Sequence, residues 1–236
     1  HRMRALSAGL ENLGRRAAGR YGRIADEAGE LALLAARAVR SLATPPWETK
    51  VWLAQMEQIG VRSFGVAAIT TVFTGMVLAL QTALALPGLG VKYYIGTVVS
   101  KSTVRELVPV LVALIVGGRI GSGMTAEIGT MKVTEQVDAM RAMAADPVRK
   151  LVVPKLAAAL VMLPALTLIG DVLGILGGLV IAVLQLQLTA SFYWNDVISA
   201  LTLEDFASGL GKSFFFAFFI TIVACHNGLK VTGGAA

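Results

Sequence analysis

The chain has 236 residues, of which 56% are hydrophobic and only 15% charged, with a mean hydropathy of +0.71. These values exclude an ordinary soluble domain, in which about a quarter of residues are charged, and a disordered chain, which is poor in apolar residues. A single cysteine, Cys225, excludes a disulfide scaffold and a multi-thiolate metal site. The net charge of +6 fits nucleic acid, an anionic membrane surface or membrane topology, so the positions of the charges must decide.

Residues 1–46 form the first predicted unit, ahead of a transmembrane domain over 47–236. The first 43 residues are polar and rich in arginine, and they lack the apolar stretch of a cleavable signal peptide. Further along, an apolar face opposite Arg37 and Arg40 predicts an amphipathic helix that lies in the cytoplasmic membrane interface, or else a solvated helix packed on a partner. That face comprises Leu31, Leu34, Val39 and Leu42, and Trp47 and Trp52 are expected to follow at headgroup level.

Three long apolar runs predict membrane spans. Residues 63–91 are uncharged and give the first, and residues 213–229 give a last span of minimal length. Residues 156–186, interrupted only by Asp171, are predicted as one long helix in preference to two tight spans. The aromatic stretch 189–194 that follows is expected to be an interfacial exit.

The remaining span is awkward, because its uncharged run 107–118 covers only about 18 Å as a helix, against a bilayer core of roughly 30 Å. Charge must therefore enter the membrane zone. We expect Arg119 to snorkel toward one face, and Arg105 and Glu106 to line a water-filled or protein-lined cavity.

The signs of the charges predict the topology. Residues 1–62 carry ten Lys and Arg against six acids, and residues 119–155 carry six against four. Residues 187–206 contain three acids and no Lys or Arg. The positive-inside rule places the first two segments in the cytoplasm, so the excess of basic residues reports membrane topology and not a nucleic-acid partner.

Three short motifs resemble binding or catalytic motifs, but their context argues against such a role. The dinucleotide-like pattern at 121–126 follows an apolar helix and not a strand, and the phosphate-loop-like 209–213 lacks the first glycine. Neighbouring Cys225 and His226 point about 100° apart on a helix and have no acid nearby in sequence. By contrast, Gly170, Gly174 and Gly178 predict close helix packing, and Asp171 is expected to face the bundle interior.

The segment at about 122–155 is predicted to be a cytoplasmic loop with two helical starts. Thr134 is expected to cap a short helix whose first turn holds Glu135 and whose apolar face comprises Val137, Met140 and Met143. Asp146 and Pro147 start the next helix. The short amphipathic helix suits docking into a groove on a soluble partner, or else a self-packed loop.

Long stretches of the sequence resemble the MlaE permease family of lipid ABC transporters. The stretches that carry the resemblance are 75–81, 105–111, 118–140, 146–154, 212–213 and 227–228. The resemblance implies an all-α integral membrane protein with an N-terminal interfacial helix, four transmembrane helices in this chain and a cytoplasmic coupling helix between the second and third spans. The resemblance also implies a fifth transmembrane helix after the fourth, which is expected either to have been truncated or to lie beyond residue 236.

The same resemblance implies a homodimeric permease of the bacterial inner membrane that moves phospholipid to or from a periplasmic MCE-domain carrier. Cytoplasmic ATPase subunits would bind the ATP and Mg²⁺, so the permease itself would carry no cofactor, metal or catalytic residue, and a small STAS-domain subunit joins many such systems. An integral membrane enzyme that modifies lipids is the alternative. A channel is a third possibility, disfavoured because no ring of pore-lining charges recurs.

The resemblance also assigns two sets of residues. Those expected to contact lipid are Leu78, Leu86, Arg105, Glu106 and Lys212. Those expected to engage the ATPase are Glu135, Gln136, Val137, Asp138 and Met140. Arg105 offers a bidentate partner for a phosphate, and Glu106 is expected to orient Arg105, to act in gating, or to form a structural pair.

Overall fold

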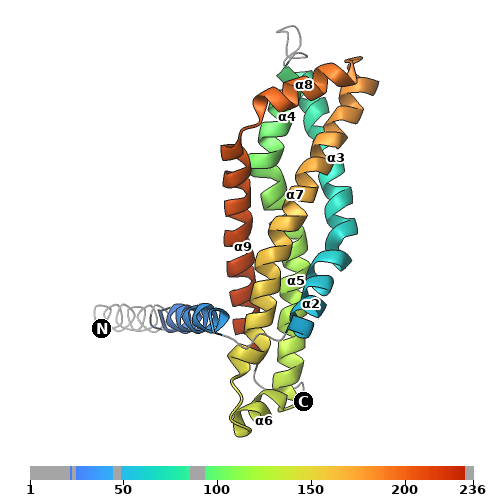
Figure 1. Cartoon of the computed structure of the whole chain (residues 1–236). Helices are drawn as coiled ribbons and strands as arrows, with labels where there is room; N and C mark the ends of the chain where they lie inside the picture. The colour runs from blue at the N-terminus through green and yellow to red at the C-terminus, as the bar shows by residue number, and fades with distance from the viewer. Residues whose placement is uncertain (1–21, 23–24, 45–48, 86–93, 232–236) are drawn as a thin grey trace, which may run out of the picture.

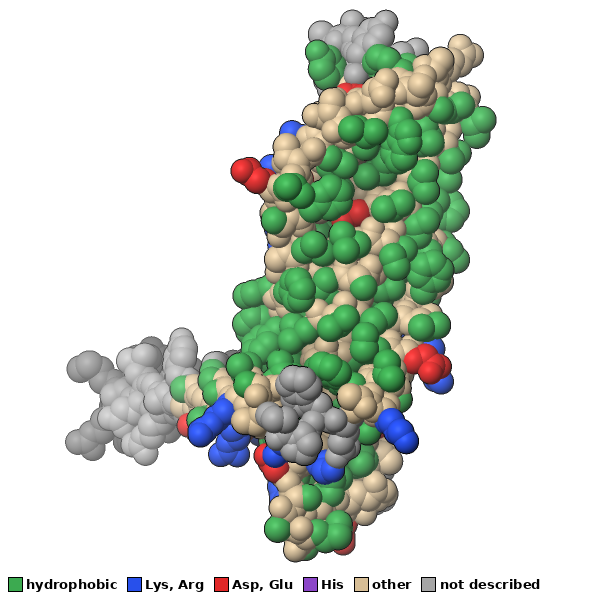
Figure 2. Space-filling model, viewed as in Figure 1, with side chains coloured by type: hydrophobic (Ala, Val, Ile, Leu, Met, Phe, Trp, Pro, Cys, Tyr) green, Lys and Arg blue, Asp and Glu red, His purple; other side chains and the backbone are tan. Residues whose placement is uncertain are grey.

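The computed structural model describes residues 22, 25–44, 49–85 and 94–231. Every regular element within these ranges is a helix, which confirms the all-α prediction. Four helices are long and apolar enough to cross a membrane, and they form an elongated bundle (Figure 1): Thr49–Ala85, Ile95–Val133, Val148–Leu184 and Leu203–Leu229. Hydrophobic side chains cover the middle of the visible face, and charged ones gather mainly toward its ends (Figure 2).

The first span begins earlier than predicted. It runs unbroken through α2 (Thr49–Met56), a π-helical turn η1 (Glu57–Val61) and α3 (Arg62–Ala85), so Trp52 lies inside the helix and not ahead of it. An uncharged run marks only the part of a helix that meets lipid, and the helix itself continues through charged residues beyond the membrane. The last residues of the predicted run, Leu86 included, lie outside the described ranges.

The helix of the second span likewise extends through charged residues on both sides of the short uncharged run 107–118. One continuous helix comprises α4 (Ile95–Ser102), a π-helical turn η3 (Thr103–Leu107) and α5 (Val108–Val133), so the short uncharged run is only its middle. Arg119 reaches across to the first span, where it donates to the Arg62 backbone oxygen and, at 3.2 Å, to the Ser63 hydroxyl. The dinucleotide-like motif lies inside α5, where it forms no phosphate-binding loop.

The third span is one long helix, as predicted, formed by the π-helical turn η4 (Val148–Val152) and α7 (Val153–Leu184). The stretch expected to be an interfacial exit forms part of a short helix, α8 (Ala190–Ala200), in which Phe192 and Trp194 are exposed. Its Tyr193 is buried and donates a hydrogen bond to the Ile175 backbone oxygen at 3.0 Å, so it is a core residue and not an interfacial anchor.

The fourth span, α9 (Leu203–Leu229), begins well before residue 213. Thr202 and Asp205 form a capping box, in which each side chain satisfies the other residue's backbone N–H, and this fixes the start of the helix. The phosphate-loop-like stretch 209–213 is therefore helical.

Glycines let α3 and α7 approach closely, as the glycine spacing predicted. A Cβ at Gly75 would overlap the Gly174 backbone oxygen, and one at Gly177 would overlap that of Val72. Asp171 on the same stretch of α7 is only 2% exposed, which confirms that it faces the bundle interior. The third span therefore forms the centre of the packing, in contact with the other three.

The helix over residues 25–42 packs on the bundle at the end that carries α6 (Figure 1). Its buried residues, Leu34 and Ala38, join a cluster with Leu156 and Cys225, while Val39 is 50% exposed, contrary to the predicted face. The face that packs on the bundle is therefore rotated by part of a turn from the predicted one. Its side chains are spaced at helical intervals: Leu31, Leu34, Ala35 and Ala38.

An ion pair also fastens this helix to the end of α9. The Glu30 carboxylate lies 2.8 Å from Lys230 Nζ and 3.8 Å from His226 Nε2. The hydrogen bond from Lys230 holds the pKa of the Glu30 carboxyl below its ordinary value. His226 thus faces Glu30, while Cys225 is buried, so the two neighbours form no nucleophile and base pair.

Candidate functional site

The π-helical turn η3 carries Arg105 and Glu106, and both side chains are exposed. Pro109, on the next turn, has no N–H to donate to the Arg105 backbone oxygen four residues earlier. Lys212 of α9 supplies a donor, with its Nζ 2.8 Å from that oxygen. Gly209 permits the approach, because a Cβ there would overlap the backbone oxygen of Val104 in the turn. A lysine side chain therefore satisfies a carbonyl that proline left open at membrane depth.

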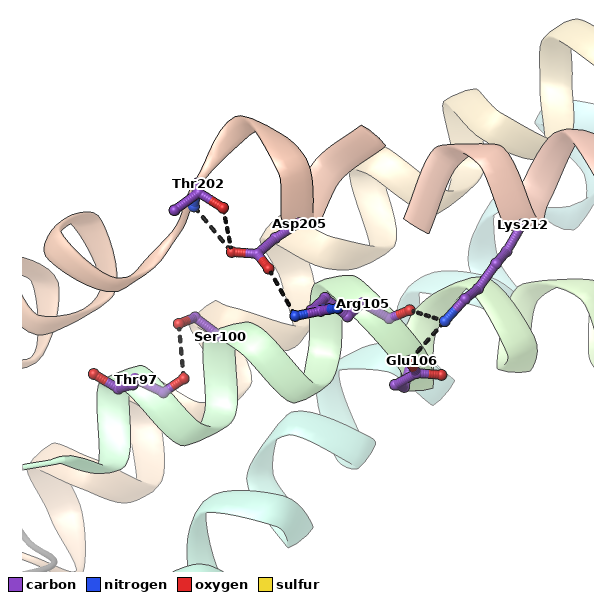
Figure 3. Close-up of polar contacts among 7 residues, drawn as sticks. All are labelled: Thr97, Ser100, Arg105, Glu106, Thr202, Asp205 and Lys212. Carbon is purple, nitrogen blue, oxygen red and sulfur yellow. Dashed lines mark hydrogen bonds and ion pairs between the residues drawn. The ribbon is translucent and has the colours of Figure 1, made fainter. Parts of the chain in front are cut away.

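Two ion pairs join the same turn to α9 (Figure 3). The Arg105 guanidinium lies 3.5 Å from Asp205 Oδ1, and Lys212 Nζ lies 2.7 Å from Glu106 Oε1. The other Asp205 oxygen accepts hydrogen bonds from the Thr202 backbone N–H at 3.0 Å and its hydroxyl at 2.9 Å. Glu106 is therefore in a structural pair with Lys212, and Asp205 is the residue that orients Arg105.

Arg105 remains available to a ligand in spite of this pair. Its side chain is 53% exposed, whereas that of Asp205 is 5% exposed. One 3.5 Å contact engages a single nitrogen of a guanidinium that carries five N–H donors, so most of the planar fork stays open. The buried Asp205 carboxylate, itself held by the helix cap, fixes the position of the Arg105 guanidinium.

A buried apolar cluster adjoins this charged turn. Leu78 on α3 and Phe206 on α9 pack against a buried cluster that includes Val104, the residue next to Arg105. The structure thus brings Arg105, Glu106 and Lys212 together and places Leu78 on the same core cluster. Leu86 lies outside the described residues.

The expected coupling helix is α6 (Gln136–Ala142), which projects at the end of the bundle opposite α8 (Figure 1). The prediction that Thr134 caps this helix is wrong, because its hydroxyl donates to the Thr130 backbone oxygen at 2.9 Å and so belongs to the end of α5. Glu135 precedes the helix in the left-handed region, with φ 60°. The cytoplasmic loop is shorter than the predicted segment 122–155, because α5 continues to Val133 and the helix of the third span begins at Val148.

Asp138 fastens α6 to α5. Its carboxylate lies 2.7 Å from Lys132 Nζ and 3.1 Å from Arg141 Nη1. The hydrogen bond from Lys132 is the main reason why the pKa of the Asp138 carboxyl is below its ordinary value. Val137 is buried, whereas Met140 is half-buried, and Glu135 and Gln136 are exposed.

Asp205 and Thr202 are site residues that the sequence reasoning missed. Their three-residue spacing is that of a capping box and could have predicted the true start of α9. Elsewhere, within the parts of the chain that the structure describes, no group of three His, Cys, Asp or Glu side chains could hold a metal ion.

Four membrane-length helices, with a charged turn near one end and a projecting helix at the other, define a multi-pass membrane protein. Residues 52–236 match the model of the family described as Permease MlaE, and the chain belongs to this family. The resemblance noted in the sequence is thereby confirmed.

Three relatives illustrate the similarity. A probable ABC transporter permease protein of Rickettsia typhi is 41% identical over 213 residues, which cover 90% of this chain and 82% of that protein. A probable ABC transporter permease protein of Synechocystis is 43% identical over 183 residues, 78% of this chain and 70% of the relative. The Arabidopsis thaliana protein TRIGALACTOSYLDIACYLGLYCEROL 1, chloroplastic, is 34% identical over 183 residues, 78% and 52% of the two chains. The chain is accordingly an ABC transporter permease subunit, which implies an ATPase partner.

Proposed function

We propose that this permease moves phospholipids and that Arg105 receives the lipid phosphate. The observation that carries the proposal is a guanidinium 53% exposed, held from behind by a buried carboxylate and adjoining an apolar cluster. A phosphate takes up two parallel N–H donors of a guanidinium, and acyl chains require an aliphatic wall. Leu78 and Leu86 would supply part of that wall.

Lys212 is proposed as a second phosphate ligand, which becomes available when the phosphate replaces Glu106 as its ion-pair partner. Its present partner Glu106 is 65% exposed, whereas Asp205 is buried and held by the helix cap. Glu106 can therefore turn toward water while Asp205 stays in place. An arriving phosphate would then replace the Glu106 carboxylate on Lys212 and keep the site close to neutral.

The proposed setting is the bacterial inner membrane. The permease would form a homodimer, exchange lipid with a periplasmic MCE-domain carrier, and take energy from ATPase subunits that bind ATP and Mg²⁺, in some systems together with a STAS-domain subunit. Residues 1–46 would form the interfacial unit and residues 47–236 the permease domain.

Reconstitution tests the proposal. Liposomes that contain the permease, its ATPase subunit and a fluorescent phospholipid should transfer the lipid to or from the carrier protein only when ATP is present. Transfer at the same rate without ATP, or ATP-dependent transfer of an unrelated solute in place of phospholipid, would contradict it.

The proposed ATPase contact gives a separate prediction for α6. Glu135 is exposed and without an ion pair in the described part of the chain, whereas Asp138 holds α6 to Lys132. We expect Glu135→Lys to reduce co-purification of the ATPase through direct repulsion, and Glu135→Lys with Asp138→Lys to detach it, because α6 is then also released from α5. Normal recovery of the ATPase with the double variant would argue against this contact.

A further inference from the structure

A polar cavity of about 150 Å³ lies between the first span and α5. Two arginines line it, Arg62 from α3 and Arg119 from α5. Its other polar lining comprises Gln55, Gln58 and Ser63. The cavity is separate from the Arg105 turn, because Arg119 lies fourteen residues further along the same continuous helix, which is about 21 Å at 1.5 Å per residue.

Both arginines mark the membrane boundary at the α6 end of the bundle. Arg62 immediately precedes the uncharged run that begins at Ser63, and Arg119 immediately follows the uncharged run 107–118. The two spans run in opposite directions, so these positions lie at the same height, as the hydrogen bonds from Arg119 to Arg62 and Ser63 require. This height is where the polar headgroups of a bilayer begin.

Both cations are exposed to solvent. No carboxylate of the described residues forms an ion pair with Arg62 or Arg119. Six other basic side chains in those ranges each have such a partner: Arg105, Lys132, Arg141, Lys155, Lys212 and Lys230. Two neighbouring cations in a pocket at a membrane boundary attract an anion, such as the phosphate of a lipid headgroup.

The cavity also orients its donors. The backbone oxygen of Arg62 and the hydroxyl of Ser63 hold the Arg119 guanidinium in place. Gln55 Oε1 accepts a hydrogen bond from Lys155 at 3.3 Å, which leaves the amide nitrogen of Gln55 as a donor. Lys155 is itself paired with Glu127 at 2.6 Å.

We propose that this cavity binds the phosphate group of a phospholipid in the leaflet at the α6 end. A cavity of about 150 Å³ can hold a phosphate group but is too small for a whole lipid, since pockets for drug-sized ligands measure roughly 300–1,000 Å³. The acyl chains therefore lie outside the cavity, where the exposed apolar side chains of α3, such as Phe64 and Ile69, can contact them. The site holds a headgroup whether or not phospholipid is the transported cargo, so it does not rest on the proposed function.

Native mass spectrometry of the purified transporter, titrated with phosphatidylglycerol or with diacylglycerol, tests the proposal. All proteins carry Arg105→Gln and Lys212→Gln, so that the first site does not contribute. Arg62→Gln with Arg119→Gln removes both cations of the cavity. Arg37→Gln with Arg40→Gln removes the same charge from exposed positions of the helix 25–42 and serves as the matched control.

We expect phosphatidylglycerol to bind the cavity variant about tenfold more weakly than the control, since charge-assisted hydrogen bonds are lost, and diacylglycerol to bind both equally weakly. Arg62→Gln alone keeps the Arg119 hydrogen bond to the Arg62 backbone, so it tests the site even if the double variant fails to fold. Equal affinity of the cavity variants and the control for phosphatidylglycerol would overturn the proposal. Full displacement of the lipid by millimolar inorganic phosphate would identify a free-anion site and would also overturn it.

Discussion

Replacing Arg105 with glutamate is expected to abolish ATP-dependent phospholipid transport while the permease stays assembled with its ATPase. The substitution places a carboxylate beside Asp205, which is 5% exposed and cannot turn away because the cap of α9 holds it. The site then repels a phosphate in place of binding it. Transport of fluorescent phospholipid in liposomes measures the effect, and co-purification of the ATPase verifies assembly.

A graded control separates charge from geometry at the same position. Arg105→Lys keeps the cation and can still pair with Asp205, but it loses the planar fork that binds a phosphate through two hydrogen bonds. We expect its transport rate to fall about tenfold, between the wild type and Arg105→Glu. Wild-type transport by Arg105→Glu would remove Arg105 from the lipid site.

The uncharged runs predict the number of spans but not their ends. A charge ends the stretch that meets lipid, and it does not end a helix, so α9 begins at Leu203 and not at residue 213. Local backbone chemistry sets such ends, here through the capping box of Thr202 and Asp205. The long helix of the third span, α7, was predicted correctly, because beyond its first turn it contains only one charge, Asp171.

The sequence also identified the charged residues of the site better than their partners. Arg105 and Lys212 stand out as cations at membrane depth, but Arg105 pairs with Asp205 and Lys212 with Glu106. These pairs form between the second and fourth spans, and the spacing of residues within one helix carries no information about which helix lies beside it. The open carbonyl before Pro109 is a local feature, but its donor comes from α9 and required the structure.

Substituting Gly75 with alanine is expected to destabilise the bundle by about 3 kcal/mol, at the upper end of the usual cost of overpacking. The new Cβ would overlap the Gly174 backbone oxygen, and a backbone atom cannot rotate away as a side chain can. Relief therefore requires α3 and α7 to separate along their contact. The midpoint of thermal unfolding in detergent measures the effect.

Two glycines of the same chain make this prediction specific. A Cβ at Gly65 would meet nothing within 4 Å, so Gly65→Ala should be neutral or stabilising by up to about 1 kcal/mol, because alanine favours a helix. A Cβ at Gly178 would lie 2.6 Å from the Tyr193 hydroxyl, a side-chain atom that can move at the expense of its hydrogen bond to Ile175. The midpoint should fall in the order Gly65→Ala, Gly178→Ala, Gly75→Ala. If Gly75→Ala and Gly65→Ala unfold at the same temperature, backbone contact does not set the approach of α3 and α7, and the glycine spacing has another cause.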